Sequence, residues 1–279
     1  MLSSLFNPLG AFRQCSRLLR MPDARPGRTA LVRTRLSFCC RNPEVGPARA
    51  RLGPFTLHAH TEGELAYLFG EVFVRREYYV DLRRPDPFIV DCGANIGFAT
   101  LFFKLHYPAA RILAFEPNPS CFKLLQCHIE ENQLRDVTAM QSACGKDNGQ
   151  ISFFVSRGFS PLSSIHGGRA ENAEEIKVKL VKLSDHLTED VDLLKLDVEG
   201  AEWDVLADLV ESGKLARVRR MAIEYHHRIG GAKSEMGSFL KILEDAGFNY
   251  DVEANLHEEQ RFAGLFQDVM IYANRPGVK

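Results

Sequence analysis

The sequence has no long apolar run, no C-x-x-C pair and no G-x-G-x-x-G motif. No apolar stretch reaches the roughly 18 residues that a membrane-spanning helix needs, so no transmembrane segment is expected. The seven cysteines form no C-x-x-C pair, which leaves zinc and dithiol redox motifs without support. Their odd number favours reduced thiols, and we expect a cytoplasmic protein. Without G-x-G-x-x-G, a closely bound dinucleotide pyrophosphate is not indicated.

Lysine is absent from residues 1–50, which contain nine arginines and only two acids, a net charge of +7. Residues 51–279 carry 26 basic and 34 acidic side chains, a net charge of −8, which disfavours a nucleic-acid partner. Because Pro8, Pro22 and Pro26 interrupt any early amphipathic helix, residues 1–50 are predicted to be a flexible or docking arm. Organelle import through this arginine-rich segment is the alternative.

Apolar strand-like runs alternate with helical patterns from residue 88 onward. Strands are predicted at 88–92, 111–116, 137–143, 192–198, 218–225, 248–253 and 268–273, and helices at 97–106, 119–132, 200–211 and 233–246. Apolar strands separated by helices are typical of a parallel sheet covered on both faces. The pattern therefore predicts an α/β fold with a doubly wound, seven-stranded sheet.

Two features lie outside this alternation. Before it, residues 51–60 read as one strand, and Thr61 with Glu64 forms a capping box that opens a helix. Within it, residues 150–155 and 176–183 read as an inserted β-hairpin with a long Gly- and Ser-rich connection. Such a loop is usually functional or disordered.

Several predicted strands end in a carboxylate, namely Asp91, Glu116, Asp197 with Glu199, and Glu224. In open parallel sheets, the ligand lies outside the carboxyl ends of the strands. Acidic side chains at that edge are costly unless they hold something or stay solvated. Their positions therefore predict a binding site.

The motif VDCGANIG (90–97) is a strand, a glycine turn and the start of a helix. Its glycines allow close approach of a ligand, and the helix offers free N–H groups. The carboxylate suits a ligand with a cationic end, such as an amino acid moiety. An ordinary strand-to-helix turn is the alternative interpretation. The candidate binding residues are Asp91, Gly93, Ala94, Asn95 and Gly97.

The next strand ends in FEPNP (115–119), where Glu116 is placed to accept both hydroxyls of a ribose. Asn118 is a candidate neighbour of an adenine, and Ser142 ends the following strand where a base needs an edge contact. A solvated helix N-terminus, with the acid favoured by the helix dipole, is the alternative.

The motif LLKLDVEGAEW (193–203) places Lys195, Asp197 and Glu199 on one side of a strand. We expect a structural ion pair between Lys195 and Asp197, and we expect Asp197 and Glu199 to reach the open edge. Trp203 is expected to pack in the core.

His226 lies in IEYHHR (223–228), where the fifth strand enters its loop. Histidine is the usual general base for removing a hydroxyl proton, so His226 is the candidate base, with Asp197 and Glu199 beside it. A divalent cation held by the carboxylates is an alternative way to activate a hydroxyl. The oxygens lack a recognisable ligand spacing, so no metal is predicted.

In this order and separation, VDCGANIG, FEPNP and KLDVEGAEW resemble the FkbM family of S-adenosylmethionine-dependent methyltransferases. The resemblance covers about residues 70–275 and includes the hairpin insertion. It implies a class I methyltransferase fold over 51–279, S-adenosylmethionine as cofactor, and O-methylation of a sugar, glycan or polyketide-like acceptor. The arginine-rich segment lies outside the family pattern.

On this hypothesis, the methionine end of the cofactor meets Asp91, Gly93 and Asn95, the ribose meets Glu116, and the adenine lies near Asn118 and Ser142. Ala94, Gly97 and Asp197 are further candidate cofactor-binding residues. The acceptor hydroxyl approaches Asp197, Glu199, His226 and the loop 156–173. Three alternatives stay open: a nicotinamide-dependent oxidoreductase, a non-catalytic partner protein with this fold, and nucleic-acid methylation through the basic arm. The partner is expected to be a small-molecule or glycan hydroxyl acceptor, with homo-oligomerisation undetermined.

Overall fold

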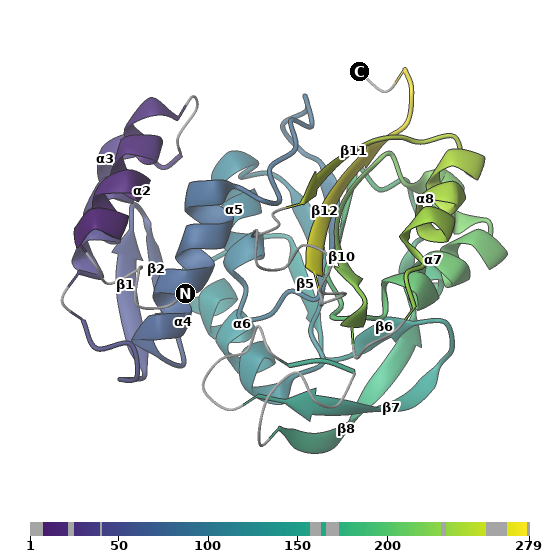
Figure 1. Cartoon of the computed structure of the whole chain (residues 1–279), viewed down its shortest axis with the longest axis horizontal. Helices are drawn as coiled ribbons and strands as arrows, with labels where there is room; N and C mark the ends of the chain where they lie inside the picture. Colours follow the sequence, from purple (N-terminus) through teal and green to yellow (C-terminus); the bar gives the residue numbers. More distant parts are fainter. Residues whose placement is uncertain are drawn as a thin grey trace.

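The computed structural model describes residues 8–21, 25–39, 41–156, 163–165, 173–229, 233–254 and 267–277. Its centre is a seven-stranded sheet in the order β11-β12-β10-β9-β3-β4-β5 (Figure 1). Neighbours from β10 to β5 pair in parallel, whereas β12 is antiparallel to β10 and β11. This confirms the expected doubly wound sheet.

The strands and helices follow the predicted alternation closely. The strands are β3 (Phe88–Cys92), β4 (Arg111–Phe115), β5 (Val137–Met140), β9 (Leu193–Leu196), β10 (Arg220–His227), β11 (Asn249–Ala254) and β12 (Gln267–Asn274). The helices between them are α5 (Phe98–His106), α6 (Pro119–Glu131), α7 (Glu202–Glu211) and α8 (Met236–Asp245), with 3₁₀ turns η3 (Leu183–His186) and η4 (Lys214–Arg217). No helix among the described residues is long and apolar enough to cross a bilayer.

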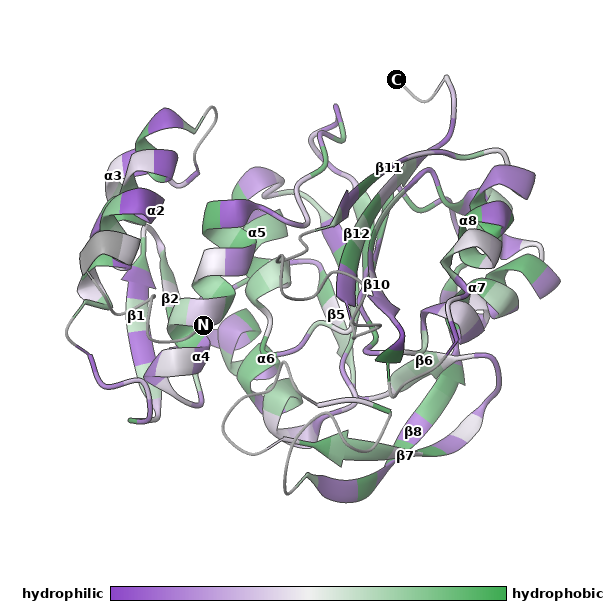
Figure 2. Ribbon diagram, viewed as in Figure 1, coloured by the Kyte–Doolittle hydropathy of each residue, from purple (hydrophilic) through white to green (hydrophobic). Residues whose placement is uncertain are grey.

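Successive residues of each central strand serve opposite faces of the sheet, as the period of two requires. Ile89 and Leu193 belong to the core cluster that includes α5 and α6, whereas Val90 and Leu194 belong to the cluster that includes α7 and α8. Both faces of these strands are therefore apolar. Figure 2 gives the hydropathy of each residue along the same ribbon. Burial on both sides leaves the strand ends as the accessible edge.

The inserted hairpin forms a small second sheet. Strands β7 (Gly149–Val155) and β8 (Glu174–Lys182) are antiparallel, as predicted. A third strand, β6 (Ala143–Gly145), pairs in parallel with β8. The single strand predicted at 137–143 was therefore wrong, because the chain leaves the large sheet after Met140 and joins the small one.

The segment before the sheet also differs from expectation. Residues 51–60 were predicted to be one strand, but β1 (Ala48–Leu52) and β2 (Phe55–Ala59) form a hairpin that turns at Gly53, whose φ is +56°. Helix α4 (Glu62–Phe69) then begins as expected, with the Thr61 side chain accepting from the Glu64 N–H. The Glu64 carboxylate accepts from the His60 N–H, one residue earlier than a capping box predicts. A π-helix, η1 (Gly70–Arg75), extends α4.

The first 50 residues contain two helices, α2 (Pro8–Arg20) and α3 (Arg28–Ser37), which lie beside β1 and β2 (Figure 1). Pro8 begins α2 instead of interrupting a helix, because proline is tolerated in the first turn. Leu18 and Leu31 are at most 1% exposed and share the core cluster of α4 and α5. The described part of this segment is docked on the domain, and the boundary expected at residue 50 falls within β1.

His128 of α6 ties the β1–β2 hairpin to the glycine turn after β3. Its Nε2 accepts from the His58 N–H at 2.7 Å, so its Nδ1 carries the proton and donates to the Ile96 carbonyl at 2.6 Å. Burial lowers the pKa of His128 from 6.5 to about 4, so the ring is neutral in the folded protein.

We predict that His128 makes the fold sensitive to acid. A histidine with a folded-state pKa below its unfolded value of 6.5 adds stability at higher pH that is lost as the pH falls towards 4. Between pH 7 and 5 this loss is about 2 kcal/mol of the free energy of unfolding. Urea unfolding at both pH values should show a smaller loss in His128→Gln, and equal losses in the two proteins would contradict this role.

Candidate functional site

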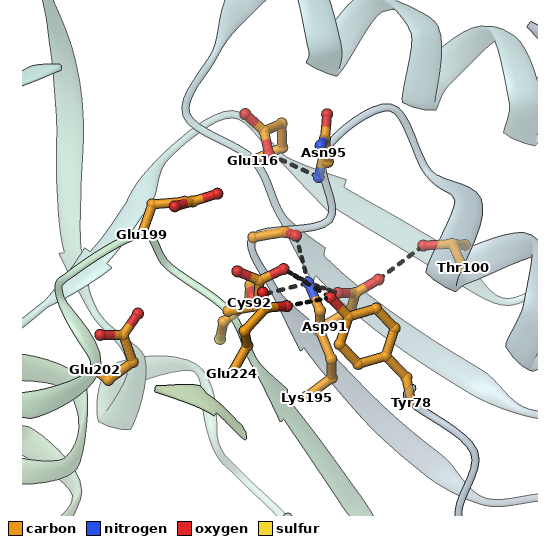
Figure 3. A network of polar contacts seen from close by, with 12 residues as sticks. Tyr78, Asp91, Cys92, Asn95, Thr100, Glu116, Lys195, Glu199, Glu202 and Glu224 are labelled. Atoms are coloured by element: carbon orange, nitrogen blue, oxygen red, sulfur yellow. Dashed lines mark hydrogen bonds and ion pairs between the residues drawn. The ribbon is translucent and has the colours of Figure 1, made fainter. Parts of the chain in front are cut away.

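The carboxyl ends of β3, β4, β9 and β10 bring the expected polar side chains to one edge of the sheet. Figure 3 shows Asn95 and Glu116 above this edge, with Glu199, Glu224 and Lys195 from the neighbouring strands and loops. These side chains surround two adjoining cavities. The first is next to β4 and the small sheet, and the second is next to α4 and η1.

Gly93 makes the turn after β3. The N–H groups of Gly93 and Ala94 both donate to the Phe115 carbonyl at 2.9 Å, which ties the turn to β4. Gly93 has a φ of +80°, and a Cβ at this position would lie 1.7 Å from the carbonyl oxygen of Asp197. No other residue fits here, since the backbones of the two strand ends touch. Gly93 lines both cavities.

Glu116 is 5% exposed at the end of β4 and lines the first cavity. One carboxylate oxygen accepts from the Asn95 N–H and the other from the Asn118 N–H, each at 2.7 Å. Burial raises the pKa of Glu116 to about 7 although these two donors act to lower it. Each oxygen keeps a free lone pair, so the carboxylate can accept two further hydroxyl groups.

The first cavity has a volume of about 570 Å³. Asn118 and Ser142 line it and are at most 2% exposed, yet Asn118 Nδ2 and Ser142 Oγ have no hydrogen-bond partner among the described residues. Phe153 and Ile165 provide apolar surface on the side of the small sheet. Unpaired buried polar atoms beside an apolar wall suit a heteroaromatic base, which needs edge contacts and a nonpolar face.

Two of the predicted binding residues lie elsewhere. Asp91 is fully buried and lines neither cavity; it accepts from Thr100 Oγ1 at 3.1 Å and pairs with Lys195 Nζ at 3.4 Å. Gly97, also outside both cavities, begins α5 with a φ of +96°, and a Cβ there would meet Leu125 Cδ1 at 2.8 Å. Asp91 is engaged in an ion pair and Gly97 in helix packing, so a direct ligand contact by either residue stays a prediction. Ala94 lines only the second cavity.

Lys195 is 2% exposed and lies under the glycine turn. Its ammonium is 3.1 Å from Asp197 Oδ2 and donates to the Gly93 carbonyl at 2.5 Å. The predicted Lys195–Asp197 ion pair is therefore present. Although burial alone would raise it, this ammonium keeps the pKa of Asp197 below its ordinary value.

Tyr78 joins this network from the segment before the sheet (Figure 3). Its Oη is 2.9 Å from both Asp197 Oδ2 and Glu224 Oε2. A phenol has one proton, so it donates to Asp197 and accepts from a protonated Glu224. Burial, followed by the nearby Asp197 charge, raises the pKa of Glu224 well above its ordinary value, which agrees with this assignment. No local motif indicated a role for Tyr78, which is 119 residues from Asp197 along the chain.

The second cavity, of about 580 Å³, shares Gly93, Asn95, Asp197 and Glu199 with the first. Its own polar lining consists of Lys195 and five further residues, of which only Glu224, a strand-end carboxylate, was expected at this edge from the sequence. These five residues are Tyr67, Glu71, Tyr78, Glu224 and Asp268. The wall is rich in hydrogen-bond acceptors and hydroxyl groups.

His226 occupies a different environment from the one expected of a base. Its side chain is 1% exposed, with Nδ1 2.8 Å from Glu202 Oε1 and Nε2 3.0 Å from Glu199 Oε2. Burial alone would lower its pKa, but Glu202, Glu224 and Asp197 raise the pKa of His226 to about 9. The ring is therefore protonated at neutral pH, with both N–H groups held by carboxylates. The assignment of His226 as the base does not fit this geometry.

Glu199 is the strained residue of the site. Its φ of +55° is uncommon for a residue with a Cβ, and its carbonyl accepts from Ser164 Oγ at 2.8 Å. Such strain concentrates where a side chain must be aimed for function. Ser164 belongs to the predicted loop 156–173, of which residues 157–162 and 166–172 lie outside the described part. Trp203 packs edge-on against Phe239 in the core, as predicted.

At this edge of the sheet, two groups of side chains are close enough to share a cation. They are Asp197, Glu199 and His226, and Glu224, His226 and Asp268, with ligand atoms within 4.8 Å of one another. Both groups contain His226, and a protonated imidazole must lose its proton before it binds a metal. The absence of a metal stays a prediction.

Comparison with known proteins identifies the family. The model of the "Methyltransferase FkbM domain" matches residues 91–250. Methyltransferase sdnD of Sordaria araneosa is 32% identical over 225 residues, which cover 69% of this chain and 85% of the relative. The chain belongs to the FkbM methyltransferase family.

Two other relatives carry more specific names. The 31-O-demethyl-FK506 methyltransferase FkbM of Streptomyces tacrolimicus is 30% identical over 238 residues, covering 72% of this chain and 87% of the relative. The 2-O-methyltransferase NoeI of Sinorhizobium fredii is 29% identical over 170 residues, covering 54% and 68%.

Because FkbM methyltransferases use S-adenosylmethionine, this is the cofactor, and the nicotinamide-dependent alternative is excluded. The first cavity fits it on structural grounds. Glu116 has free acceptor positions for ribose hydroxyls, and Asn118 Nδ2 and Ser142 Oγ are unpaired among the described residues.

We predict that Gly93→Ala abolishes S-adenosylmethionine binding and lowers the free energy of unfolding by about 3 kcal/mol or more, because the new Cβ would collide with the Asp197 carbonyl at a positive φ. Gly237→Ala is the matched control: its position in α8 is exposed and open, so it should stabilise the protein by about 0.5–1 kcal/mol. Urea unfolding and calorimetric titration measure both effects. A Gly93→Ala protein of normal stability and affinity would refute the close approach.

We predict that cofactor affinity depends on the ionisation of Glu116. Ribose hydroxyls donate to the ionised carboxylate, so affinity should fall as the pH drops below the Glu116 pKa of about 7. Between pH 8 and 6 the Kd should rise about tenfold. In Glu116→Gln this rise should disappear, whereas the exposed control Glu130→Gln should retain it. The cofactor's own titration is common to all three proteins, so an equal rise in Glu116→Gln would remove the ribose assignment.

Proposed function

We propose that this FkbM methyltransferase transfers the methyl group of S-adenosylmethionine to a hydroxyl of a small-molecule acceptor, of the sugar, glycan or polyketide-like kind. The observation that carries the proposal is the pair of adjoining cavities. They share the wall of Gly93, Asn95, Asp197 and Glu199, so a ligand in one meets a ligand in the other at these residues.

In this proposal the first cavity holds the cofactor. Glu116 accepts the ribose hydroxyls, and Asn118 and Ser142 contact the adenine with the polar atoms that lack a partner among the described residues. Gly93 and Asn95 border the methionine end at the shared wall. When bound, S-adenosylmethionine supplies an electrophilic methyl group on a sulfonium sulfur.

The acceptor hydroxyl needs a group that takes its proton, because an alcohol is a poor nucleophile at neutral pH. Asp197 is already engaged by Lys195 and Tyr78, and His226 is protonated. Glu199 lines both cavities, and its Oε2 forms an ion pair with His226 Nε2 at 3.0 Å. We assign it as the base: its carboxylate takes the hydroxyl proton as the oxygen attacks.

His226 and Glu202 position this base. Glu202 accepts from the Gly200 N–H at 3.0 Å and from His226 Nδ1, while His226 Nε2 lies 3.0 Å from Glu199 Oε2 as an ion-pair partner. These contacts orient the Glu199 carboxylate, whose own backbone has a positive φ. Alignment of the reacting groups and exclusion of water then contribute much of the rate of such a displacement.

Oxygen as the acceptor atom is supported by the names of two relatives, an O-demethyl-FK506 methyltransferase and a 2-O-methyltransferase. The second cavity agrees with such an acceptor, since its carboxylates and phenols can hydrogen-bond to several hydroxyl groups. A non-catalytic protein would not need a positioned Glu199. A methyl-transfer assay separates the catalytic function from the non-catalytic one.

We predict that Glu199→Gln lowers turnover about 10²- to 10⁴-fold, because an amide cannot accept the hydroxyl proton. Affinity for S-adenosylmethionine should change far less, since Glu116, Asn118 and Ser142 are untouched. A methyl-transfer assay over hydroxylated sugars and polyketides, with calorimetry for the cofactor, measures both quantities. The exposed control Glu130→Gln should behave as wild type.

His226→Gln distinguishes the two assignments of the base. It keeps a donor but loses the charge, so turnover should fall less than in Glu199→Gln. A loss of turnover in His226→Gln with full activity in Glu199→Gln would return the role of base to the histidine. No methyl transfer to any acceptor by folded, cofactor-bound wild-type protein would favour the non-catalytic alternative.

A further inference from the structure

The N-terminal helices expose an unusual share of large apolar side chains. Six such residues are strongly exposed in the described part of the chain, and four of them lie in the first 45 residues. They are Phe12, Leu19, Leu36 and Val45. Phe12 is 72% exposed and Leu19 57%, and both lie on α2 seven residues apart, on the same side of the helix.

Arginines accompany these apolar residues. Arg13, Arg17 and Arg20 are exposed on α2, and none of them forms an ion pair with a described residue. We call Phe12, Arg13, Arg17, Leu19 and Arg20 the α2 surface. Beside it, a shallow groove runs between α2 and η1. Its lining residues are Arg13, Ser16, Arg17, Arg20, Met21, Val74, Arg75 and Arg76, without an acid among them.

The uneven distribution of charge along the chain favours one orientation of the protein, with the α2 surface facing an anionic partner. Residues 1–50 carry a net charge of +7 and the remainder −8, so the protein is strongly dipolar despite its net charge of −1. An anionic plane attracts the arginine-rich end and repels the acidic remainder. Charge complementarity therefore favours one orientation on a negatively charged surface.

We propose that the α2 surface docks this protein on an anionic lipid bilayer. A helix with arginines beside exposed apolar side chains matches the interface between headgroups and acyl chains, where the apolar side chains are buried and the arginines meet phosphate. Phe12 and Leu19 provide the apolar contact, and Arg13, Arg17 and Arg20 the ionic one. Leucine has no π-face for stacking, so a lipid surface explains this pair better than nucleic acid does.

Docking would bring the second cavity towards the bilayer. Segment η1 packs against α2 and carries Arg75 and Arg76 to the basic groove, while Glu71 of the same segment lines the second cavity. Arg17 Nη2 donates to the Arg75 carbonyl at 3.4 Å. The proposal does not depend on the reaction, because it rests on the outer face of α2 alone.

Vesicle co-sedimentation of the full chain tests the proposal. The protein should bind vesicles of phosphatidylcholine with about 30% phosphatidylglycerol, and not vesicles of pure phosphatidylcholine. The triple variant Arg13→Gln, Arg17→Gln, Arg20→Gln should partition about 100-fold less, since each basic residue near an anionic bilayer contributes about fivefold. Phe12→Ser with Leu19→Ser should weaken binding at least tenfold.

The matched control is Lys123→Gln, Lys179→Gln, Lys233→Gln, which removes the same charge from exposed positions outside the α2 surface. It should bind anionic vesicles as wild type does, and all variants should bind S-adenosylmethionine normally if they are folded. An equal loss in the control would reduce the effect to net charge and overturn the proposal. No binding of wild type to anionic vesicles would also overturn it, and α2-dependent binding to an RNA duplex instead would assign the surface to nucleic acid.

Discussion

The site depends on one buried ammonium, that of Lys195. It pairs with Asp91 from β3 and Asp197 from its own strand end, and donates to the carbonyl of Gly93. Two carboxylates could not both be ionised in this interior without it, because removing one partner of a buried pair typically costs 3–5 kcal/mol. The glycine turn, the end of β9 and the wall shared by the cavities are therefore held by a single cation. Asp91 lies beneath the site and pairs with that cation.

Protonation of the acidic groups around Asp197 reduces the remaining negative charge of the site. Tyr78 is buried near Asp197, with the partly exposed Glu224 and Glu71 beside it, and loss of hydration raises the pKa of each well above its ordinary value. His226, in contrast, is protonated, because the neighbouring carboxylates raise its pKa. The same acidic surroundings thus leave one carboxyl neutral and one imidazole charged. A polar acceptor entering the second cavity meets both kinds of group, donors and acceptors, in fixed positions.

Local sequence pattern predicted those parts of the molecule that depend on interactions between residues close together in the sequence. Apolar runs of strand length determined the seven-stranded sheet, and the sheet in turn brought Glu116, Asp197 and Glu199 to one edge. The Lys195–Asp197 pair followed from a period of two. Tyr78 and Glu71 were missed because η1 and the segment that follows it reach the site through tertiary packing, which the spacing of residues in the sequence does not show. The charge of His226 was missed for a related reason: it depends on Glu202 and Glu199, whose distances only the folded chain defines.

The N-terminal segment is a second case in which tertiary packing does not follow from local sequence pattern. Its prolines and arginines predicted a flexible or docking arm, and the described part is docked: Leu18 of α2, Leu31 of α3 and Phe38 just after α3 lie in the core shared with α4. Burying these side chains stabilises α4 and its extension η1, which supply Tyr67 and Glu71 to the second cavity. The arm is therefore part of the support of the site as well as a basic surface. A segment outside the family pattern can in this way influence which acceptor the cavity admits without contacting it, because it helps determine where one wall of that cavity lies.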